Sequence, residues 1–442
     1  MIERNDWIDT LDREIFPFVE YPGFENRYPT IDMVGLAEVQ LDELREASEK
    51  LFRIFCKVTE VFQKCSDEFM EDMEIPAGMR SFLHQQNMLG LPTWLSRFDF
   101  VFDSRRRLHM VEINADTPCA VIEAFYGNRM ACRYYRRKNP NRDSYEELKD
   151  WLKYIFDRTY SIEVDLQRGR ISTEHPFVFS CFEDYVEDRG TTLFLMQALK
   201  DAIGSLYPDN MVVFASFYEL GVNPDGSVQL PDGRTAAVLY RLHPMELLIE
   251  ETSEEGDALG AMFMQGYQEG RFHLFNPPEA IIMQSKGFQA LVWSLAHSDR
   301  AGKIFTRDEL QTIRAYMLPS YFERDFAVQQ AAGFLPPEKW IKKPIWGREG
   351  NGIQVVDEAG RLVSEKYVPN ADEVVQRDSD KVLVQKFVAQ PAWSLRTDEG
   401  LLNGYLTLSC FMLGERASAV YSRFSPEAIA GTEAYWVPIY VK

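Results

Sequence analysis

The sequence lacks several features, and each absence argues against a class of protein. No apolar run approaches the roughly 18 residues that a membrane-spanning helix needs, and residues 1–16 lack the basic start and apolar stretch of a signal peptide. The six cysteines include no CxxC pair, which argues against a zinc site or a disulfide framework and favours reduced thiols. We therefore expect a cytoplasmic protein with no membrane partner.

Basic residues are the scarcer charge. The chain has 48 Lys and Arg against 68 Asp and Glu, which gives a net charge of −20. Nucleic-acid binding uses Lys and Arg against phosphates, so this balance argues against DNA or RNA as a partner. It is compatible with a cationic substrate such as a polyamine, but many soluble cytoplasmic proteins are equally acidic.

What is present is typical of a soluble globular protein with several lobes: 442 residues, 45% of them hydrophobic. Strand-like and helix-like stretches alternate through the middle third of the chain, which predicts an α/β lobe with parallel pairing. Pro277-Pro278 reads as a boundary after this lobe. Two late runs, 405–413 and 416–424, are predicted to form an antiparallel pair.

The stretch from Arg97 to Asn114, RFDFVFD-SRRR-LHMVEIN, predicts a β-hairpin. A symmetric turn centred on residues 105–106 places Asp99 opposite Glu112 and Arg97 opposite Asn114, with 108, 110, 112 and 114 on a common face. Facing carboxylates destabilise a sheet unless a cation lies between them, and oxygen ligands of this kind suit Mg²⁺. A solvated strand face is an equally good interpretation of this stretch alone.

A second informative stretch, WIKKPIWGREGNGIQVV, begins at residue 340. A strand carrying Lys343 leads into a loop with Gly347, Gly350 and Gly352, and residues 353–356 resume as a strand. Glycines allow backbone N–H groups to approach phosphate oxygens, so a hairpin flap over phosphates is implied. Neither a P-loop nor a dinucleotide-binding motif is present, and an ordinary glycine-containing turn is the alternative.

Acidic residues gather at positions 183–188, just before a helix that we expect to begin at residues 190–191. Carboxylates at such a position usually cap the helix or interact with its dipole, and we favour that over a pocket that holds an amine. Thr117, after the hairpin, lies where a helix N-terminus could hold an anionic group. Cys119 is better explained as a small core residue than as a nucleophile. Residues 382–387 form a short strand that could line a nucleotide base.

Taken together, these stretches resemble the synthetase domain of glutathionylspermidine synthases and its stand-alone relatives. The matching pieces follow the expected order across nearly the whole chain: RFDF at 97, EINADTP at 112, EDRGT at 187, SK at 285, KPIWGREG at 343 and SRF at 422. Each piece is weak alone, and the ordered set is specific.

The resemblance implies a mixed α/β (α+β) fold that is ATP-grasp-like, with circularly permuted segments and a preceding pre-ATP-grasp α/β lobe. Residues 1–115 would supply an N-terminal helical region and the metal-binding hairpin. Residues 116–278 would form the pre-ATP-grasp-like substrate lobe. Residues 279–442 would form the ATP-grasp lobe with the glycine flap and the C-terminal strands.

Carried over position by position, the resemblance also assigns site residues. The resemblance implies that Mg²⁺ is bound by Asp99, Glu112 and Asn114, and that ATP is bound by Lys286, Lys343, the flap glycines Gly347, Gly350 and Gly352, Gln385 and Phe387. It implies that Arg97 contacts substrate and phosphate and that Arg423 stabilises the reaction intermediate. Arg348 would contact the thiol-peptide substrate, and the peptide and amine sites would include Thr117, Glu187 and Asp188.

The implied activity is an ATP- and Mg-dependent ligase that joins a carboxylate to an amine through an acyl phosphate, with substrates such as glutathione and spermidine. The alternatives are a ligase for another acid and amine, or a nucleotide-binding protein that no longer catalyses. The sequence departs from the family pattern at Trp346, where we expect a small flap residue. The bifunctional family members also carry an amidase domain with a cysteine nucleophile, which we do not expect within this sequence.

Overall fold

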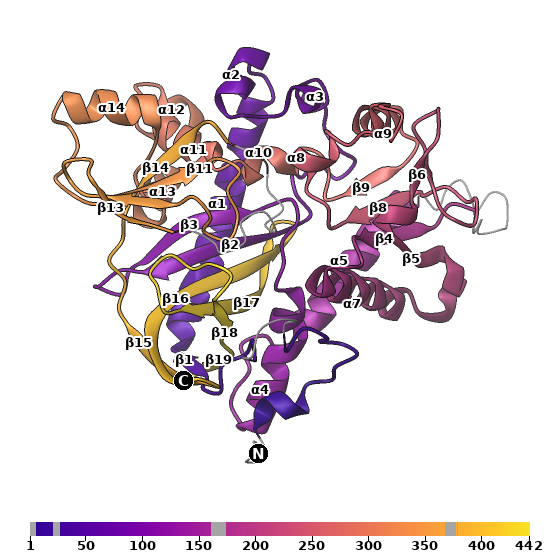
Figure 1. Ribbon diagram of the computed structural model, residues 1–442, viewed down its shortest axis with the longest axis horizontal. Coiled ribbons are helices and arrows are strands. Elements are labelled where there is room, and N and C mark those ends of the chain that lie inside the picture. The colour runs from indigo at the N-terminus through magenta and orange to yellow at the C-terminus, as the bar shows by residue number, and fades with distance from the viewer. Residues whose placement is uncertain (1–5, 21–26, 161–173, 367–376, 378) are drawn as a thin grey trace.

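A computed structural model describes residues 6–20, 27–160, 174–366, 377 and 379–442. The chain forms three main sheets with helices packed around them (Figure 1). Among the described helices, none is long and apolar enough to cross a membrane.

The central sheet joins two distant parts of the sequence. Its strands are antiparallel and follow the order β18 (Tyr435–Trp436), β17 (Arg416–Ser425), β16 (Gly400–Leu413), β2 (Leu95–Phe102) and β3 (Leu108–Asn114), with β15 (Trp393–Thr397) paired to β16. The predicted hairpin and the predicted late pair are therefore both confirmed, and they lie in one sheet.

The long helix α1 (Glu38–Phe62) packs against the central sheet (Figure 1). Its apolar side chains recur at helical spacing and are buried, including Leu44, Leu51, Phe55 and Phe62. Phe55 contacts Phe98 of β2 with 5.6 Å between the ring centroids. The alternating phenylalanines of the hairpin thus face α1, which leaves their polar neighbours on the opposite side of the sheet.

A second antiparallel sheet carries the predicted glycine loop. Its order is β10 (Ser320–Phe322), β14 (Val382–Lys386), β11 (Trp340–Pro344), β12 (Gln354–Val356) and β13 (Leu362–Glu365). The accompanying helices are α10 (Ala280–Gln284), α11 (Gly287–Ala296), α12 (Ala301–Ile304), α13 (Arg307–Tyr316) and α14 (Glu323–Ala331). The predicted strand, glycine loop and strand are confirmed as β11, residues 345–353 and β12.

The third sheet is parallel, as predicted for the middle of the chain. It runs β5 (Val212–Ser216), β4 (Phe177–Cys181), β8 (Val238–Arg241) and β9 (His273–Phe275). Helices α5 (Ser144–Thr159), α7 (Val186–Ile203), α8 (Met245–Leu248) and α9 (Leu259–Gln268) belong to this part (Figure 1). Shorter elements are α2 (Asp67–Asp72), α3 (Ala77–Arg80), α4 (Asn128–Tyr134), the parallel pair β1 (Val34–Leu36) and β19 (Ile439–Val441), and the hairpin β6 (Gly221–Val222) and β7 (Val228–Gln229).

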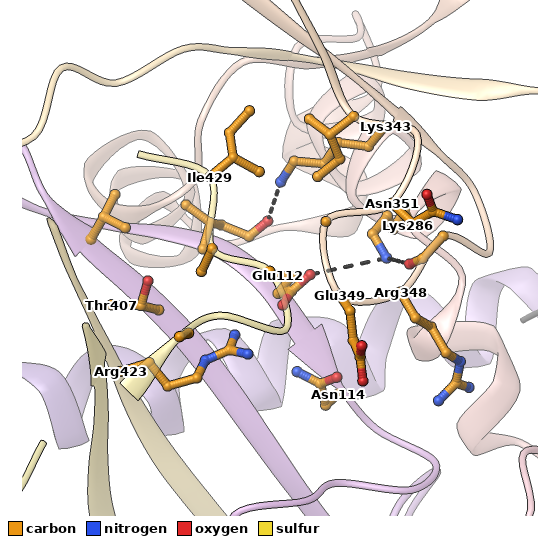
Figure 2. Close-up of a pocket in the computed structure, with 18 of the residues that line it drawn as sticks. Glu112, Asn114, Lys286, Lys343, Arg348, Glu349, Asn351, Thr407, Arg423 and Ile429 are labelled. Atoms are coloured by element: carbon orange, nitrogen blue, oxygen red, sulfur yellow. Dashed lines mark hydrogen bonds and ion pairs between the residues drawn. The ribbon is translucent and has the colours of Figure 1, made fainter. Parts of the chain in front are cut away.

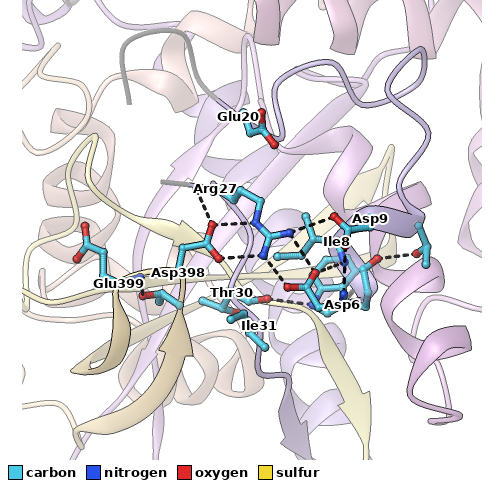
Figure 3. A network of polar contacts seen from close by, with 12 residues as sticks. Asp6, Ile8, Asp9, Glu20, Arg27, Thr30, Ile31, Asp398 and Glu399 are labelled. Carbon is cyan, nitrogen blue, oxygen red and sulfur yellow. Dashed lines mark hydrogen bonds and ion pairs between the residues drawn. The ribbon is translucent and has the colours of Figure 1, made fainter. Parts of the chain in front are cut away.

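Arg27 ties the start of the chain to the central sheet (Figure 3). Its guanidinium donates to Asp398 at 2.8 and 2.9 Å and to Asp6 at 2.6 and 3.1 Å, and it lies 3.4 Å from Asp9. The side chains of Arg27 and Asp398 are 10% and 9% exposed, so solvent screens this contact weakly.

Replacing Arg27 with methionine should therefore lower the free energy of unfolding by about 1.5–3 kcal/mol, the usual worth of hydrogen bonds to charged groups. Denaturant unfolding of both proteins measures this. Arg142→Met is the matched control, because Arg142 pairs with Asp143 on the open surface, and it should leave stability unchanged. Equal stability of the two variants would show that the ion pairs of Arg27 do not stabilise the fold.

Candidate active site

One pocket of about 340 Å³ lies between the central sheet, the glycine loop and the start of α7. Nearly all of the residues that the sequence singled out line it. They are Arg97, Glu112, Asn114, Thr117, Glu187, Asp188, Lys286, Lys343, Gly347, Arg348, Gly350, Gln385, Phe387 and Arg423. Asp99 and Gly352 do not line the pocket. Asp99 is paired with Glu112, and Gly352 lies between Asn351 and Ile353 in the sequence, and these three neighbours do line it.

The hairpin register brings the predicted carboxylates together, but by a different route from the one we expected. Asp99 pairs with Glu112 and Arg97 with Asn114, as predicted, whereas Phe100 pairs with Met110. Val111 is thus an extra residue, a β-bulge, and it reverses the side-chain alternation of β3. The predicted common face of residues 108, 110, 112 and 114 is therefore wrong, because the bulge sends Met110 into the core and Glu112 into the pocket.

The pairing next to the turn is also shifted by one residue from the predicted pairing, because the predicted turn centres between Arg105 and Arg106. The N–H of Asp103 donates to the carbonyl of Arg107, so the turn centres on Arg105. The extra residue Val111 shifts the pairing back by one position, so Asp99 still lies opposite Glu112 as predicted. It also leaves the carbonyl of Val111 available inside the pocket, where the ammonium of Lys343 donates to it at 3.1 Å.

Asp99 is the centre of a buried charge cluster beneath the residues that line the pocket. It has no exposed surface, and its two oxygens accept from the Arg97 guanidinium at 2.8 and 2.9 Å. Arg423 of β17 lies 3.6 Å from the same carboxylate and points into the pocket (Figure 2). Arg97 also donates to the Cys119 carbonyl at 2.7 Å. Two guanidiniums are thus held beside one carboxylate at the edge of the pocket.

Two lysines approach the pocket from the glycine-loop side. Lys286 donates to the Gly347 carbonyl at 2.6 Å and lies 4.0 Å from Glu112 (Figure 2). Lys343 donates to the Gln385 side chain at 2.8 Å. Burial lowers the pKa of both lysines, that of Lys343 to about 8, while the charge of Glu112 opposes the shift. Both ammonium groups are therefore poised to gain an anionic partner.

The glycine loop is closely packed against the C-terminal segment. Gly350 has a φ of 76°, and a Cβ there would meet the Ala430 carbonyl at 2.6 Å, so only glycine fits. Trp346, the unexpected bulky residue, is 3% exposed and donates to the Glu74 carbonyl at 2.9 Å. It therefore anchors the loop from behind and takes no space in the pocket.

Arg348 and Glu349 extend from the loop on the pocket side (Figure 2). Arg348 forms an ion pair with Glu246 of α8, whose side chain is 1% exposed. In this structure Arg348 thus bridges the glycine loop and the part of the chain that contains the parallel sheet. The sequence analysis did not single out either Glu246 or Glu349.

Carboxylates line the opposite end of the pocket. Glu187 and Asp188 come from α7, and Glu349 joins them from the loop. Burial, followed by the charge of Glu187, raises the pKa of Asp188 to about 8, and the same two causes raise the pKa of Glu349. A cation placed here would relieve this repulsion.

The prediction for α7 itself needs correction. The helix begins at Val186 and not at residues 190–191, and its first turn includes Glu187 and Asp188, where the helix dipole favours carboxylates. Of the four carboxylates in the stretch, Glu183 and Asp184 are exposed and lie outside the pocket lining. The capping and pocket interpretations therefore both apply to Glu187 and Asp188.

The chain matches a known family along its whole length. The family model of the glutathionylspermidine synthase pre-ATP-grasp region matches residues 1–442. This chain belongs to that family. Membership indicates a synthetase-type, ligase-like enzyme.

A solved structure supports the same fold class. A glutathione synthetase-like effector from Globodera pallida, in its apo form, is similar with a TM-score of 0.53 over 94% of this chain and 90% of that chain, at 11% sequence identity. At this identity the likeness shows the fold alone. The predicted mixed α/β, ATP-grasp-like fold of this glutathionylspermidine synthase family member is confirmed.

Mg²⁺ is the cation predicted from the sequence, and the pocket offers oxygen donors for such an ion. The Glu112 carboxylate and the Asn114 amide line the pocket, and the Glu112 side chain is 28% exposed. Asp99 is less available, because Arg97 binds both of its oxygens. Among the described residues no group of three His, Cys, Asp or Glu side chains is placed to share an ion. The donor chemistry thus fits a hard cation at Glu112 and Asn114, with Asp99 adding to it only if Arg97 moves.

Buried polar side chains hold the hairpin in place against the parallel sheet, and the sequence analysis missed them. The Asn276 side chain bonds both the N–H of Trp94 and the carbonyl of Asp116. Asp116 in turn pairs with Arg241 at 2.7 Å, with neither side chain exposed. Asn276 and Arg241 belong to no local motif, and Asp116 lies within the EINADTP stretch but was given no role. Only the folded chain brings the three together.

Proposed function

We propose that this chain is an ATP- and Mg-dependent ligase that joins a substrate carboxylate to an amine through an acyl phosphate. The observation that supports it best is a single pocket with two kinds of charge. Lys286, Lys343 and Arg423 contribute cations suited to phosphates, and Glu187 and Asp188 contribute anions suited to an amine. The scattered cysteines of the sequence remain the ground for proposing a cytoplasmic enzyme.

In the first step a substrate carboxylate attacks the γ-phosphate of ATP. Lys286, Lys343 and the loop N–H groups would hold the phosphates and balance their charge, which is most of what phosphoryl transfer requires of a protein. Gln385 and Phe387 of the pocket lining would contact the base. Bound at Glu112 and Asn114, Mg²⁺ would neutralise charge on the transferring phosphoryl group.

In the second step an amine displaces phosphate from the acyl group. The oxyanion of the tetrahedral intermediate would lie near Arg97 and Arg423, whose guanidiniums would stabilise its charge. One such donor is typically worth about 10²–10³-fold in rate. Glu187, Asp188 and Glu349 would hold the other charges of a polyamine. By the family resemblance we propose glutathione as the acid, with Arg348 and Thr117 near it, and spermidine as the amine.

Phosphate release from ATP tests the proposal. Release with glutathione plus spermidine, and not with either alone, is the expected result. Release only with other acid and amine mixtures would replace the substrates and retain the ligase. A protein that binds ATP and releases no phosphate with any mixture would be a nucleotide-binding protein, and the proposed function would be wrong.

Nucleotide affinity should also depend on the protonation of Lys343. Its pKa of about 8 leaves it charged at pH 7 and mostly neutral at pH 9, so ATP affinity should fall about tenfold between these values. Lys343→Arg stays charged over this range and should show a flatter profile by calorimetry. The same slope in both proteins would show that Lys343 does not contact the phosphates.

A further inference from the structure

Glu123 is a buried carboxyl group beside the acidic end of the pocket, and the mechanism above does not use it. Its side chain is completely buried, in a π-helical turn that spans Glu123–Gly127. One oxygen, Oε1, accepts a hydrogen bond from the Tyr28 hydroxyl at 3.0 Å. The other, Oε2, has no hydrogen-bond partner among the described residues. A buried carboxyl with an unsatisfied oxygen is costly to keep, which suggests a role beyond packing.

Tyr28 connects this carboxyl to the pocket. It is part of the pocket lining, and its hydroxyl lies 2.9 Å from that of Tyr421, which also lines the pocket. The Tyr28 backbone is fixed on both sides, because its N–H donates to the Val19 carbonyl at 2.8 Å and its carbonyl accepts from the Trp436 N–H at 3.0 Å. The preceding residue, Arg27, forms the ion pairs with Asp6 and Asp398 that Figure 3 shows. Tyr28 is therefore held with its hydroxyl between Glu123 and the pocket.

The surroundings of Glu123 raise its pKa to about 8, so a fraction of this group is an ionised carboxylate that can accept a proton near neutral pH. Burial raises its pKa well above the usual range for a carboxyl group, and the charge of Glu187 adds to this, while the Tyr28 hydrogen bond and Arg97 act in the opposite direction. Among the described residues, Tyr421 contacts this pair through the Tyr28 hydroxyl. A proton acceptor works best when its pKa lies near the working pH, and an ordinary exposed glutamate does not meet that condition.

We propose that Tyr28 and Glu123 form the relay that takes the proton from the attacking amine. The ammonium nitrogen gives a proton to the Tyr28 oxygen as the Tyr28 hydroxyl proton passes to Glu123 Oε1. The freed nitrogen lone pair then forms the C–N bond with the acyl phosphate, the C–O bond to phosphate breaks, and the second nitrogen proton leaves with the phosphate. This inference rests on the proposed ligase function, and it adds the proton acceptor that a charged amine requires.

Hydroxylamine separates this role from a structural one. It is uncharged at neutral pH and captures acyl phosphates without losing a proton beforehand, so it needs no relay. With glutathione, ATP and Mg²⁺ present, Glu123→Gln and Tyr28→Phe should lose at least about 100-fold in ligation of spermidine, the lower range for a general base. Both variants should form the hydroxamate at close to the parent rate.

A matched control is Tyr126→Phe. Tyr126 is a buried tyrosine in the same turn, its hydroxyl accepts from the Asp12 N–H at 3.1 Å, and it does not line the pocket. This variant should retain both reactions.

Each other outcome overturns a distinct claim. Equal loss of both reactions in Glu123→Gln and Tyr28→Phe would show that the pair only supports the fold of the site, and equal retention would show that it takes no part. A parent protein that forms neither product would refute the proposed function itself, and the relay with it.

Discussion

Asp99→Asn should lower phosphate release by about 10³-fold while the chain remains folded. Asp99 holds Arg97 through two hydrogen bonds and lies 3.6 Å from Arg423. Without the charge of Asp99, the guanidiniums of Arg97 and Arg423 repel each other, and neither is held in its position. Loss of one such transition-state donor costs about 10²–10³-fold, and this substitution disturbs two. Steady-state phosphate release with the full substrate mixture measures the effect, and far-ultraviolet circular dichroism checks the fold.

Asp103→Asn is the matched control, in the turn that directly follows the strand of Asp99. Asp103 is 8% exposed and bonds the turn through Arg107, but it does not line the pocket. It should keep the parent turnover. The Mg²⁺ requirement then separates two roles for Asp99. A higher requirement in Asp99→Asn supports a metal ligand, and an unchanged requirement with lower turnover supports a residue that positions Arg97. Parent turnover in Asp99→Asn would reject both.

The hairpin shows how much of the site a sequence pattern can predict. Alternating phenylalanines and the two carboxylates were enough to predict the strands and to place Asp99 opposite Glu112. They could not reveal the bulge at Val111, because alternation on one strand does not say which residue of the partner is left unpaired. The same bulge provides the carbonyl that Lys343 contacts. A correct pair was thus predicted from an incorrect turn.

The residues that the sequence analysis missed share a different property. Tyr28, Glu123, Glu246 and Asn276 act through partners more than 90 positions away in the chain. No periodicity or local motif records such contacts, because long-range burial creates them. Glu349 is the exception. It lies inside the glycine motif itself, and its carboxylate between two glycines was a signal that could have been used.

The glycine loop that follows Lys343 was easier to predict because its parts are local. The strand, glycine loop and strand follow one another in the sequence, and antiparallel pairing of neighbours fixes their geometry. Trp346 is instructive in the same loop. Its size argued against a flap, yet its ring turns away from the pocket and its indole N–H bonds Glu74. A bulky residue can belong to such a loop when the core behind it has room.

Arg423→Ala should lower turnover by about 10²–10³-fold and leave ATP affinity within about threefold of the parent value, because the proposed role of Arg423 is to stabilise the oxyanion of the second step. Its guanidinium reaches the pocket from β17 on the side of Asp99, whereas Lys286 and Lys343 reach it from the glycine-loop side (Figure 2). Its Nε has no hydrogen-bond partner among the described residues, so the group is available to a new acceptor.

Turnover from steady-state kinetics and ATP affinity from calorimetry test this separately. Arg416→Ala, at the exposed start of the same strand, is the control and should match the parent in both. Arg423→Lys should recover only part of the turnover, because an ammonium keeps the charge and loses the planar pair of donors. A loss of ATP affinity of more than about tenfold in Arg423→Ala would instead move Arg423 into the nucleotide site, and the oxyanion would then depend on Arg97 alone.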